Sequence, residues 1–340
     1  MAKNPIGILA VLLASLTLSG CGGGGQAAEA QPTPTTNAEQ LQQFLYGHNT
    51  ASVQRWSEPD AEREHQTLLT HFADLGVETT LFETRYAYTN LPQLTLLLSK
   101  PGNRRLVVYN HGHGGFPTAS ETFARQLLSL LLDNGYDVLF ASMPLVGANA
   151  LDPGGSYWIK TRGASGPATV AQDVLAMLGH GIYEYIDDPD HYMHYFIDGA
   201  LLPLQAIEGG YDAVSYVGLS DGGGTGLVAC SVHRFEKCIL VAGFLPDYLR
   251  VASTADVGDI EQFTRSFYQR FDVLDLMQLA KQNSGLLVMY LNRKDPCCFA
   301  DPQASEFQRQ FPDYNIVVTD LDIHGFDAVE IFNVLSASDH

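Results

Sequence analysis

The chain has 340 residues, of which 46% are hydrophobic and 17% charged, and its formal net charge at pH 7 is −19. The apolar content is ample for a large core. The acidic balance argues against binding to nucleic acid, or to anionic lipid by electrostatic attraction alone. About 300 residues follow an N-terminal export segment, and that length suits one large α/β domain better than two.

The first 20 residues have the pattern of an export signal. Lys3 supplies a positive charge, and residues 6–18 form an apolar stretch too short for a stable membrane span. The stretch ends in Leu18-Ser19-Gly20-Cys21, which resembles the lipobox of bacterial lipoproteins. The resemblance implies cleavage before Cys21 and lipidation of that residue. Gly22, in place of an aspartate, implies sorting to the outer membrane. The alternative is an ordinary secretory signal with an incidental cysteine.

The segment after the cysteine is expected to be a tether. Residues 22–40 are mostly Gly, Ala, Gln, Pro and Thr, so they offer little apolar surface to offset the entropy of ordering. We therefore predict a signal peptide at 1–20, a lipidated cysteine and flexible linker at 21–40, and a folded domain at 41–340. The expected partner is a bacterial membrane, reached through the lipid on Cys21.

Hydrophobic patterning predicts the elements of the folded domain. Two helical patterns lie within 41–76, one of them at 61–75. Strand-like segments lie at 77–85, 94–99, 105–110, 136–142, 213–219, 238–243, 285–291 and 315–320. Helical spacing marks 122–134, 195–208, 224–232 and 328–336. Strands followed by regular strand–helix alternation predict an α/β fold, with a mostly parallel sheet covered by helices on both faces.

Four cysteines follow Cys21, and an even number in an exported protein permits disulfides. They are Cys230, Cys238, Cys297 and Cys298. Cys230 with Cys238 would tie a helix end to the next strand, and the adjacent pair would form a vicinal bridge. Cross-pairing is also possible, because connectivity does not follow from sequence. No spacing among them resembles a zinc site.

The segment Gly218-Leu219-Ser220-Asp221-Gly222 follows the strand pattern of 213–217 and is itself followed by two more glycines. A serine bracketed by glycines between a strand and a helix start is typical of a nucleophile elbow, in which the tight turn exposes the serine alone. The alternative is an ordinary glycine-rich turn.

A nucleophilic serine needs a base and an orienting acid, and both follow strands farther along the chain. Asp295 follows the strand at 285–291, and His324 follows the strand at 315–320. In this order and placement the chain resembles the α/β-hydrolase-fold serine hydrolases, from Val77 to its end. The resemblance implies that Ser220 is the nucleophile, Asp295 the orienting acid and His324 the general base.

A glycine-rich loop follows the strand at 105–110. Its sequence, His111-Gly112-His113-Gly114-Gly115, resembles the HG-type oxyanion loop of the same superfamily. The resemblance implies that the backbone N–H groups of Asp221 and His113 stabilise the oxyanion. Gly114 replaces His113 if the loop lies one residue later. Each such donor contributes roughly 3 kcal/mol to transition-state stabilisation.

Other residues offer alternative interpretations. Asp247 is a rival orienting acid, whereas Asp320 and Asp322 fit a surface or capping role better. His111 and His113 could instead assist the nucleophile or bind a metal. A second possible metal group lies farther on and comprises Asp187, Asp188, Asp190, His191 and His194, but its spacing is uneven. We therefore expect no metal and no cofactor.

The segment at about 143–194 is expected to form a cap-like insertion above the serine. It contains or borders several aromatic residues, namely Tyr157, Trp158, Tyr183, Tyr185, Tyr192 and Tyr195. Most of them are expected to pack the insertion onto the domain. Any that reach the site would suit aryl, sugar or other polar esters. No long amphipathic lid helix is evident, which argues against an interfacially activated lipase.

The leading functional hypothesis is a membrane-tethered serine esterase acting on a small-molecule ester. The first alternative is a serine peptidase, because the GxSxGG elbow loosely resembles that of prolyl-oligopeptidase relatives. The peptidase is less favoured, because no propeller-sized N-terminal domain that would restrict access to the serine is evident. The second alternative is a binding lipoprotein that uses the same fold without catalysis. The sequence carries no signal for an oligomeric state.

Overall fold

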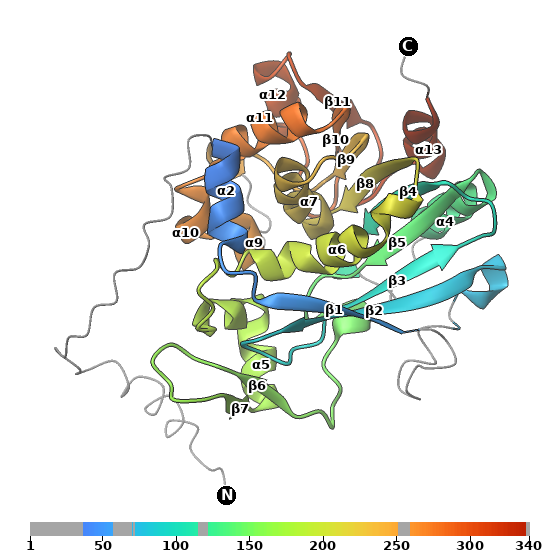
Figure 1. The fold of residues 1–340 in the computed structure, drawn as a ribbon. Coiled ribbons are helices and arrows are strands. Elements are labelled where there is room, and N and C mark those ends of the chain that lie inside the picture. Colours follow the sequence, from blue (N-terminus) through green and yellow to red (C-terminus); the bar gives the residue numbers. More distant parts are fainter. Residues whose placement is uncertain (1–36, 57–69, 71, 115–121, 251–258, 338–340) are drawn as a thin grey trace, which may run out of the picture.

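A nine-stranded sheet forms the centre of the molecule in the computed structural model, which describes residues 37–56, 70, 72–114, 122–250 and 259–337 (Figure 1). The strand order is β1-β2-β3-β5-β4-β8-β9-β10-β11. β1, β2, β3 and β5 pair antiparallel, and all pairs from β5 to β11 are parallel. The strands are β1 (Ala51–Trp56), β2 (Glu78–Tyr86), β3 (Leu94–Ser99), β4 (Arg105–Asn110), β5 (Tyr136–Ala141), β8 (Ala213–Leu219), β9 (Lys237–Val241), β10 (Leu286–Asn292) and β11 (Asn315–Thr319).

Helices cover both faces of this sheet (Figure 1). α4 and α13 pack on each other over one face, and α6, α7 and α11 cover the other. The longer helices are α2 (Asn37–Tyr46), α4 (Thr122–Asp133), α6 (His194–Ile207), α7 (Asp221–Val232), α11 (Val273–Asn283), α12 (Gln303–Gln310) and α13 (Ala328–Ser336). The shorter ones are α5 (Gln172–Leu178), α8 (Asp247–Arg250), α9 (Ile260–Phe263) and α10 (Arg265–Tyr268). Within the described ranges, none of these helices combines the length and apolarity that a membrane crossing requires.

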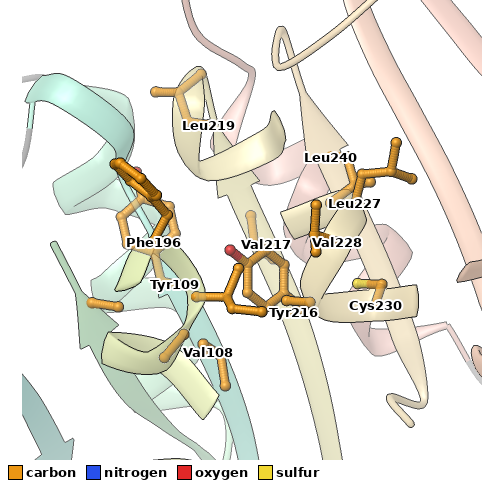
Figure 2. Close-up of a cluster of buried hydrophobic side chains, with 14 of the residues drawn as sticks. Val108, Tyr109, Phe196, Tyr216, Val217, Leu219, Leu227, Val228, Cys230 and Leu240 are labelled. Atoms are coloured by element: carbon orange, nitrogen blue, oxygen red, sulfur yellow. The ribbon is translucent and has the colours of Figure 1, made fainter. Parts of the chain in front are cut away.

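The core beneath Ser220 is packed from the two central strands and the helix that follows the serine. Tyr109 of β4, Tyr216 and Val217 of β8 and Val228 of α7 are all 1% exposed or less. They fill the core on both faces of the sheet, because Tyr216 and Val217 are successive residues of β8 and point to opposite faces (Figure 2). Because the core is close-packed on both faces, the carboxyl end of β8 is held rigidly, and the next residue along the chain is Ser220.

The predicted elements agree with the structure in type, with differences in extent. The strands at 94–99, 105–110 and 213–219 have the predicted bounds. α7 starts at Asp221, three residues before the predicted helix start. Three glycines there lower helix propensity, but packing against β8 and β9 outweighs propensity.

The N-terminal part of the domain differs more from the prediction. β1 was not predicted, and it pairs with β2 at the edge of the sheet. α2 begins at Asn37, so the last four residues of the expected tether are helical. Most of the helix predicted at 61–75 lies outside the described residues, as do the signal segment and Cys21.

The expected insertion, after β5 and up to α6, contains a two-stranded sheet, β6 (Tyr157–Ile159) with β7 (Ala168–Val170), then α5 and the 3₁₀ segment η6 (Gly179–Tyr185). Most of its aromatic residues pack inward, as predicted. Tyr157, Tyr183, Tyr192 and the bordering Tyr195 are buried, whereas Tyr185 is 49% exposed.

The four cysteines form two disulfides, each between near neighbours. Cys230 at the end of α7 bonds to Cys238 in β9, and Cys297 bonds to Cys298. Of the pairings left open by the sequence, the two local ones are therefore realised.

Candidate active site

Ser220 lies between the end of β8 and the first residue of α7, in the tight turn that its flanking glycines predicted. Its φ is 57° and its ψ is −129°, a left-handed backbone conformation that non-glycine residues rarely adopt. A Cβ on Gly218 would overlap the carbonyl of Gly222, and a Cβ on Gly222 would overlap the carbonyl of Asn110. Both positions must therefore be glycine, and the turn presents Ser220 at the N-terminus of a 12-residue helix.

Asp295 and His324 are in direct contact. His324 Nδ1 lies 2.9 Å from Asp295 Oδ2 and 3.1 Å from Oδ1. The carboxylate is fully buried and also accepts the backbone N–H of Cys297 at 2.7 Å. These contacts fix the imidazole with Nδ1 on the acid. The other ring nitrogen, Nε2, is buried and has no hydrogen-bond partner among the described residues.

Asn292 holds the loop that carries His324, a role that sequence reasoning missed. It is the last residue of β10 and is 1% exposed. Its side-chain amide donates to the carbonyls of Ile323 and Gly325, each at 2.8 Å, and its Oδ1 accepts the Thr319 hydroxyl at 2.6 Å. The backbone is therefore clamped on both sides of His324. In the sequence, the signal for this role is an Asn directly after the predicted strand at 285–291, three residues before Asp295.

The same loop runs back from the sheet edge toward the central strands. Gly325 lies against Phe123 of α4, where an added Cβ would come within 2.7 Å of the ring. The rings of Phe123 and Phe326 lie 4.8 Å apart. α4 follows β4, which is the neighbour of β8 in the sheet. The loop that carries His324 therefore leads from the outer strand β11 toward the carboxyl end of β8, where Ser220 lies.

The glycine-rich loop after β4 lies against the elbow. Gly112 has a φ of 71°, and a Cβ built on it would lie 2.6 Å from the Leu219 carbonyl oxygen and 3.0 Å from the Asp221 nitrogen. The following residues form the 3₁₀ turn η4 (Gly112–Gly114). The Asp221 N–H is the first of α7 and has no intrahelical acceptor. The sequence-predicted donors Asp221, His113 and Gly114 thus come from two segments in contact with each other.

The His113 side chain joins a group that the sequence did not predict. Its Nδ1 contacts Asp221 Oδ2, and its Nε2 lies 2.5 Å from Asp259 Oδ2. Burial lowers the pKa of His113, but the carboxylates of Asp221 and Asp259 outweigh that effect and raise it to about 11. His180 stacks on His113 with ring centroids 4.8 Å apart, and its Nδ1 lies 3.0 Å from Glu261 Oε2.

His324 Nδ1 bonds to Asp295, and the three rival acids are exposed. Asp247 is exposed at the start of α8, and Asp320 is 78% exposed and pairs with Arg293 at 3.1 Å. Asp322 is also exposed. His111 is buried, with its Nδ1 2.5 Å from the Tyr109 hydroxyl.

The second possible metal group does not converge on one point within the described residues. His194 lies between Asp198 and Asp188, at 2.6 and 3.3 Å, while His191 stacks on Phe44.

Comparison with known proteins gives a structural likeness only. No protein-family model and no curated sequence matches the chain. An acylaminoacyl peptidase of Pyrococcus horikoshii has a TM-score of 0.50 at 14% identity, over 76% of this chain and 40% of that one. Acetyl xylan esterase 1 of a Thermoanaerobacterium species has a TM-score of 0.48 at 15% identity, over 88% and 92%. An S-formylglutathione hydrolase of Agrobacterium tumefaciens has a TM-score of 0.49 at 15% identity, over 77% and 94%.

The chain spans less than half the length of the peptidase it resembles. The likeness to that structure and the observed strand order identify the α/β-hydrolase fold, with a mostly parallel sheet covered by helices on both faces. This was the fold class predicted from the sequence.

Proposed function

We propose that this chain is a serine hydrolase that cleaves carboxylic esters through an acyl-enzyme on Ser220. The observation that carries the proposal is the Asp295–His324 pair. It leaves one buried imidazole nitrogen without a partner, on a loop that runs toward the strained turn holding Ser220. A base with a free nitrogen and a buried orienting carboxylate is what a serine hydroxyl needs to become a nucleophile.

In the acylation step, Ser220 Oγ attacks the ester carbonyl carbon and its proton passes to His324 Nε2. The buried Asp295 carboxylate stabilises the resulting imidazolium through Nδ1. The carbonyl oxygen becomes an oxyanion, which accepts the backbone N–H groups of Asp221 and of His113 or Gly114. The carbonyl then re-forms, the C–O bond to the alcohol breaks, and His324 returns its proton to the departing alkoxide.

Deacylation reverses the same proton path. Water attacks the acyl-enzyme carbonyl while His324 Nε2 removes its proton. The tetrahedral intermediate collapses, and Ser220 Oγ recovers that proton as the carboxylic acid leaves. The N-terminus of α7 favours negative charge at the oxyanion in both steps.

The proposed substrates are small esters rather than emulsified triglycerides. Within the described insertion, α5 and the 3₁₀ segment η6 have seven residues each, so no long apolar lid helix is available there for interfacial activation. Most aromatic side chains of the insertion, which would suit aryl, sugar or other polar esters where they reach the site, are buried. Turnover of p-nitrophenyl acetate or butyrate without turnover of a triglyceride emulsion would support this class, and the reverse preference would contradict it.

The test of the reaction is steady-state kinetics on such an ester with Ser220→Ala. We expect kcat to fall by at least about a thousandfold with the fold retained by circular dichroism. Ser99→Ala, in the last residue of β3, is the matched control and should retain activity. Equal activity in the Ser220→Ala variant would contradict the proposal.

A peptidase is the second candidate, favoured by the GxSxGG elbow and by the likeness to the acylaminoacyl peptidase. The acyl chemistry at Ser220 would be the same, with an amine in place of the alcohol. A panel of dipeptide amides measured beside acetate and butyrate esters separates the two. A higher kcat/KM on the amides would favour the peptidase.

We also propose that the protein is held in the bacterial envelope by lipid on Cys21, most simply at the outer membrane. The support is the lipobox-like Leu18-Ser19-Gly20-Cys21 and the following Gly22. Cys21→Ser should release the protein from the membrane fraction and abolish incorporation of labelled palmitate. Membrane retention without palmitate in that variant would overturn the lipid anchor.

A further inference from the structure

Four potential metal ligands from three separate segments meet at the glycine-rich loop that follows β4. Their ligand atoms lie within 4.8 Å of one another. One comes from η4, one from η6 in the insertion, and two from the start of α9. The residues are His113, His180, Asp259 and Glu261.

Each imidazole in this group has one nitrogen occupied outside it and one directed into it. His180 Nε2 lies 2.7 Å from the carbonyl oxygen of Pro144, so Nε2 carries the proton and donates it. Its Nδ1 faces Glu261 Oε2 at 3.0 Å and Asp259 Oδ2 at 3.6 Å. His113 contacts Asp221 through Nδ1, which leaves Nε2 toward Asp259. Metal-binding histidines are held in this way, with the second nitrogen donating to a carbonyl or a carboxylate.

The carboxylates need a positive charge between them and the imidazoles. The Glu261 side chain is fully buried, and its Oε1 has no hydrogen-bond partner among the described residues. If both imidazoles were neutral, the lone pairs of the nitrogens that face the group would repel the carboxylate oxygens. Either a proton on each ring or one shared divalent cation removes the repulsion. The cation also supplies a partner for the buried, unpaired Glu261 oxygen.

We infer that His113, His180, Asp259 and Glu261 form a binding site for a divalent transition-metal ion of the zinc type. Two imidazole nitrogens and two carboxylate oxygens are a ligand set that suits Zn²⁺, whereas Ca²⁺ and Mg²⁺ prefer all-oxygen sites. One Zn²⁺ would neutralise the Asp259 and Glu261 carboxylates, while the Asp221 carboxylate accepts the N–H of His113 Nδ1. From the sequence, metal binding was only an alternative role for His113, and the other three ligands were not predicted because their spacing matches no known metal motif.

The position of the site gives the ion a structural role in the reaction, and this part rests on the proposed function. His113 supplies one of the expected oxyanion N–H groups, and its side chain binds Asp221, which supplies the other. The ion would fasten both to His180 of the insertion. It would therefore act as a positioning group for the oxyanion donors.

The test is zinc content and affinity in the full-length protein in detergent, stripped with a chelator and reloaded with Zn²⁺. We expect about one zinc per chain in the wild type and equally in Ser220→Ala, so the result does not depend on the proposed catalysis. His180→Ala and Glu261→Gln should lose the zinc. Asp221→Asn should weaken binding by about ten- to a hundredfold through the second nitrogen of His113. His233→Ala is the matched control, because His233 pairs with Glu208 outside the site and should leave zinc content unchanged.

Co²⁺ replacement provides an independent readout. The cobalt-loaded wild type and Ser220→Ala should show visible d–d absorption that the His180→Ala and Glu261→Gln variants lack. The inference would be overturned if the folded wild type held less than about a tenth of an equivalent of zinc and gave no cobalt spectrum. The carboxylates would then be paired with protonated imidazoles. Undiminished zinc affinity in Glu261→Gln would overturn the inference too.

Discussion

At the scale of single residues, Asn292 connects the acid loop to the base loop. Its buried amide binds the backbone on both sides of His324 and takes no part in proton transfer itself. We predict that Asn292→Ala lowers kcat on a p-nitrophenyl ester by about ten- to a hundredfold and changes KM little, because it misplaces the base without touching the substrate.

Asn315→Ala is the control for this prediction. Asn315 begins β11 and its side-chain amide donates to the Leu287 carbonyl at 3.3 Å, at the opposite end of the same strand pair. Both variants should lose some stability, but only the Asn292 variant should lose kcat. Equal kcat in the two variants would mean that Asn292 has no positioning role.

Site residues could be predicted from the sequence where they directly follow a predicted strand. Asp295 and His324 each follow a parallel strand, and such strand ends meet at one edge of the sheet, so their contact could be predicted. His180 and Glu261 could not be found in this way. They come from the short helix α9 and the 3₁₀ segment η6, which no sequence pattern predicted, and what distinguishes them is burial beside an opposite charge, which depends on the tertiary structure.

At the scale of elements, the disulfide from α7 to β9 anchors the helix that starts at Ser220. Cys230 and Cys238 are both fully buried, and they lie 8 residues apart. We predict that replacing both by Ala lowers the free energy of unfolding by about 2 to 3 kcal/mol, because closing such a loop restricts the unfolded chain. Urea unfolding measures the change.

The vicinal pair provides the control for that measurement. Cys297 and Cys298 are adjacent, so their bond restricts almost no loop, and replacing both by Ala should change unfolding free energy much less. Equal losses in the two double variants would show that loop closure is not the source of the stability.

Helices and strands were predicted correctly where the hydrophobic pattern was strong. A strand was missed where only its pairing with a neighbouring strand defines it. The buried segments at β4 and β8 were predicted as strands because most of their residues are apolar and several are β-branched or aromatic. β1 was missed because it lies at the sheet edge with partly exposed residues on both faces, so no alternation marks it.

At the scale of the whole molecule, a polar network that is buried except at His48 joins the N-terminal segment to the insertion and α6. His194 lies between Asp198 and Asp188, the Tyr195 hydroxyl donates to Asp188 at 2.7 Å, and His48 pairs with Asp190 at 2.9 Å. Burial lowers the pKa of His194, but the two carboxylates outweigh that effect and raise it to about 9.

Because this pKa is higher in the folded state than the ordinary value near 6.5, the network stabilises the protein fully below pH 6.5. That stabilisation is lost as the pH rises toward about 9. We predict that the wild type loses roughly 1 to 3 kcal/mol more unfolding free energy over this interval than His194→Gln does. Urea unfolding of both proteins at several pH values measures the difference. Parallel pH profiles would contradict the assignment, and His233→Gln should behave like the wild type.

The central claim is that Ser220 forms a covalent intermediate, and fluorophosphonate labelling followed by intact-mass and peptide analysis tests it most directly. We predict one adduct per chain, located on the peptide that contains Ser220, absent from Ser220→Ala and greatly slowed in His324→Ala. An adduct on a different residue, or undiminished labelling of a folded Ser220→Ala protein, would contradict the account.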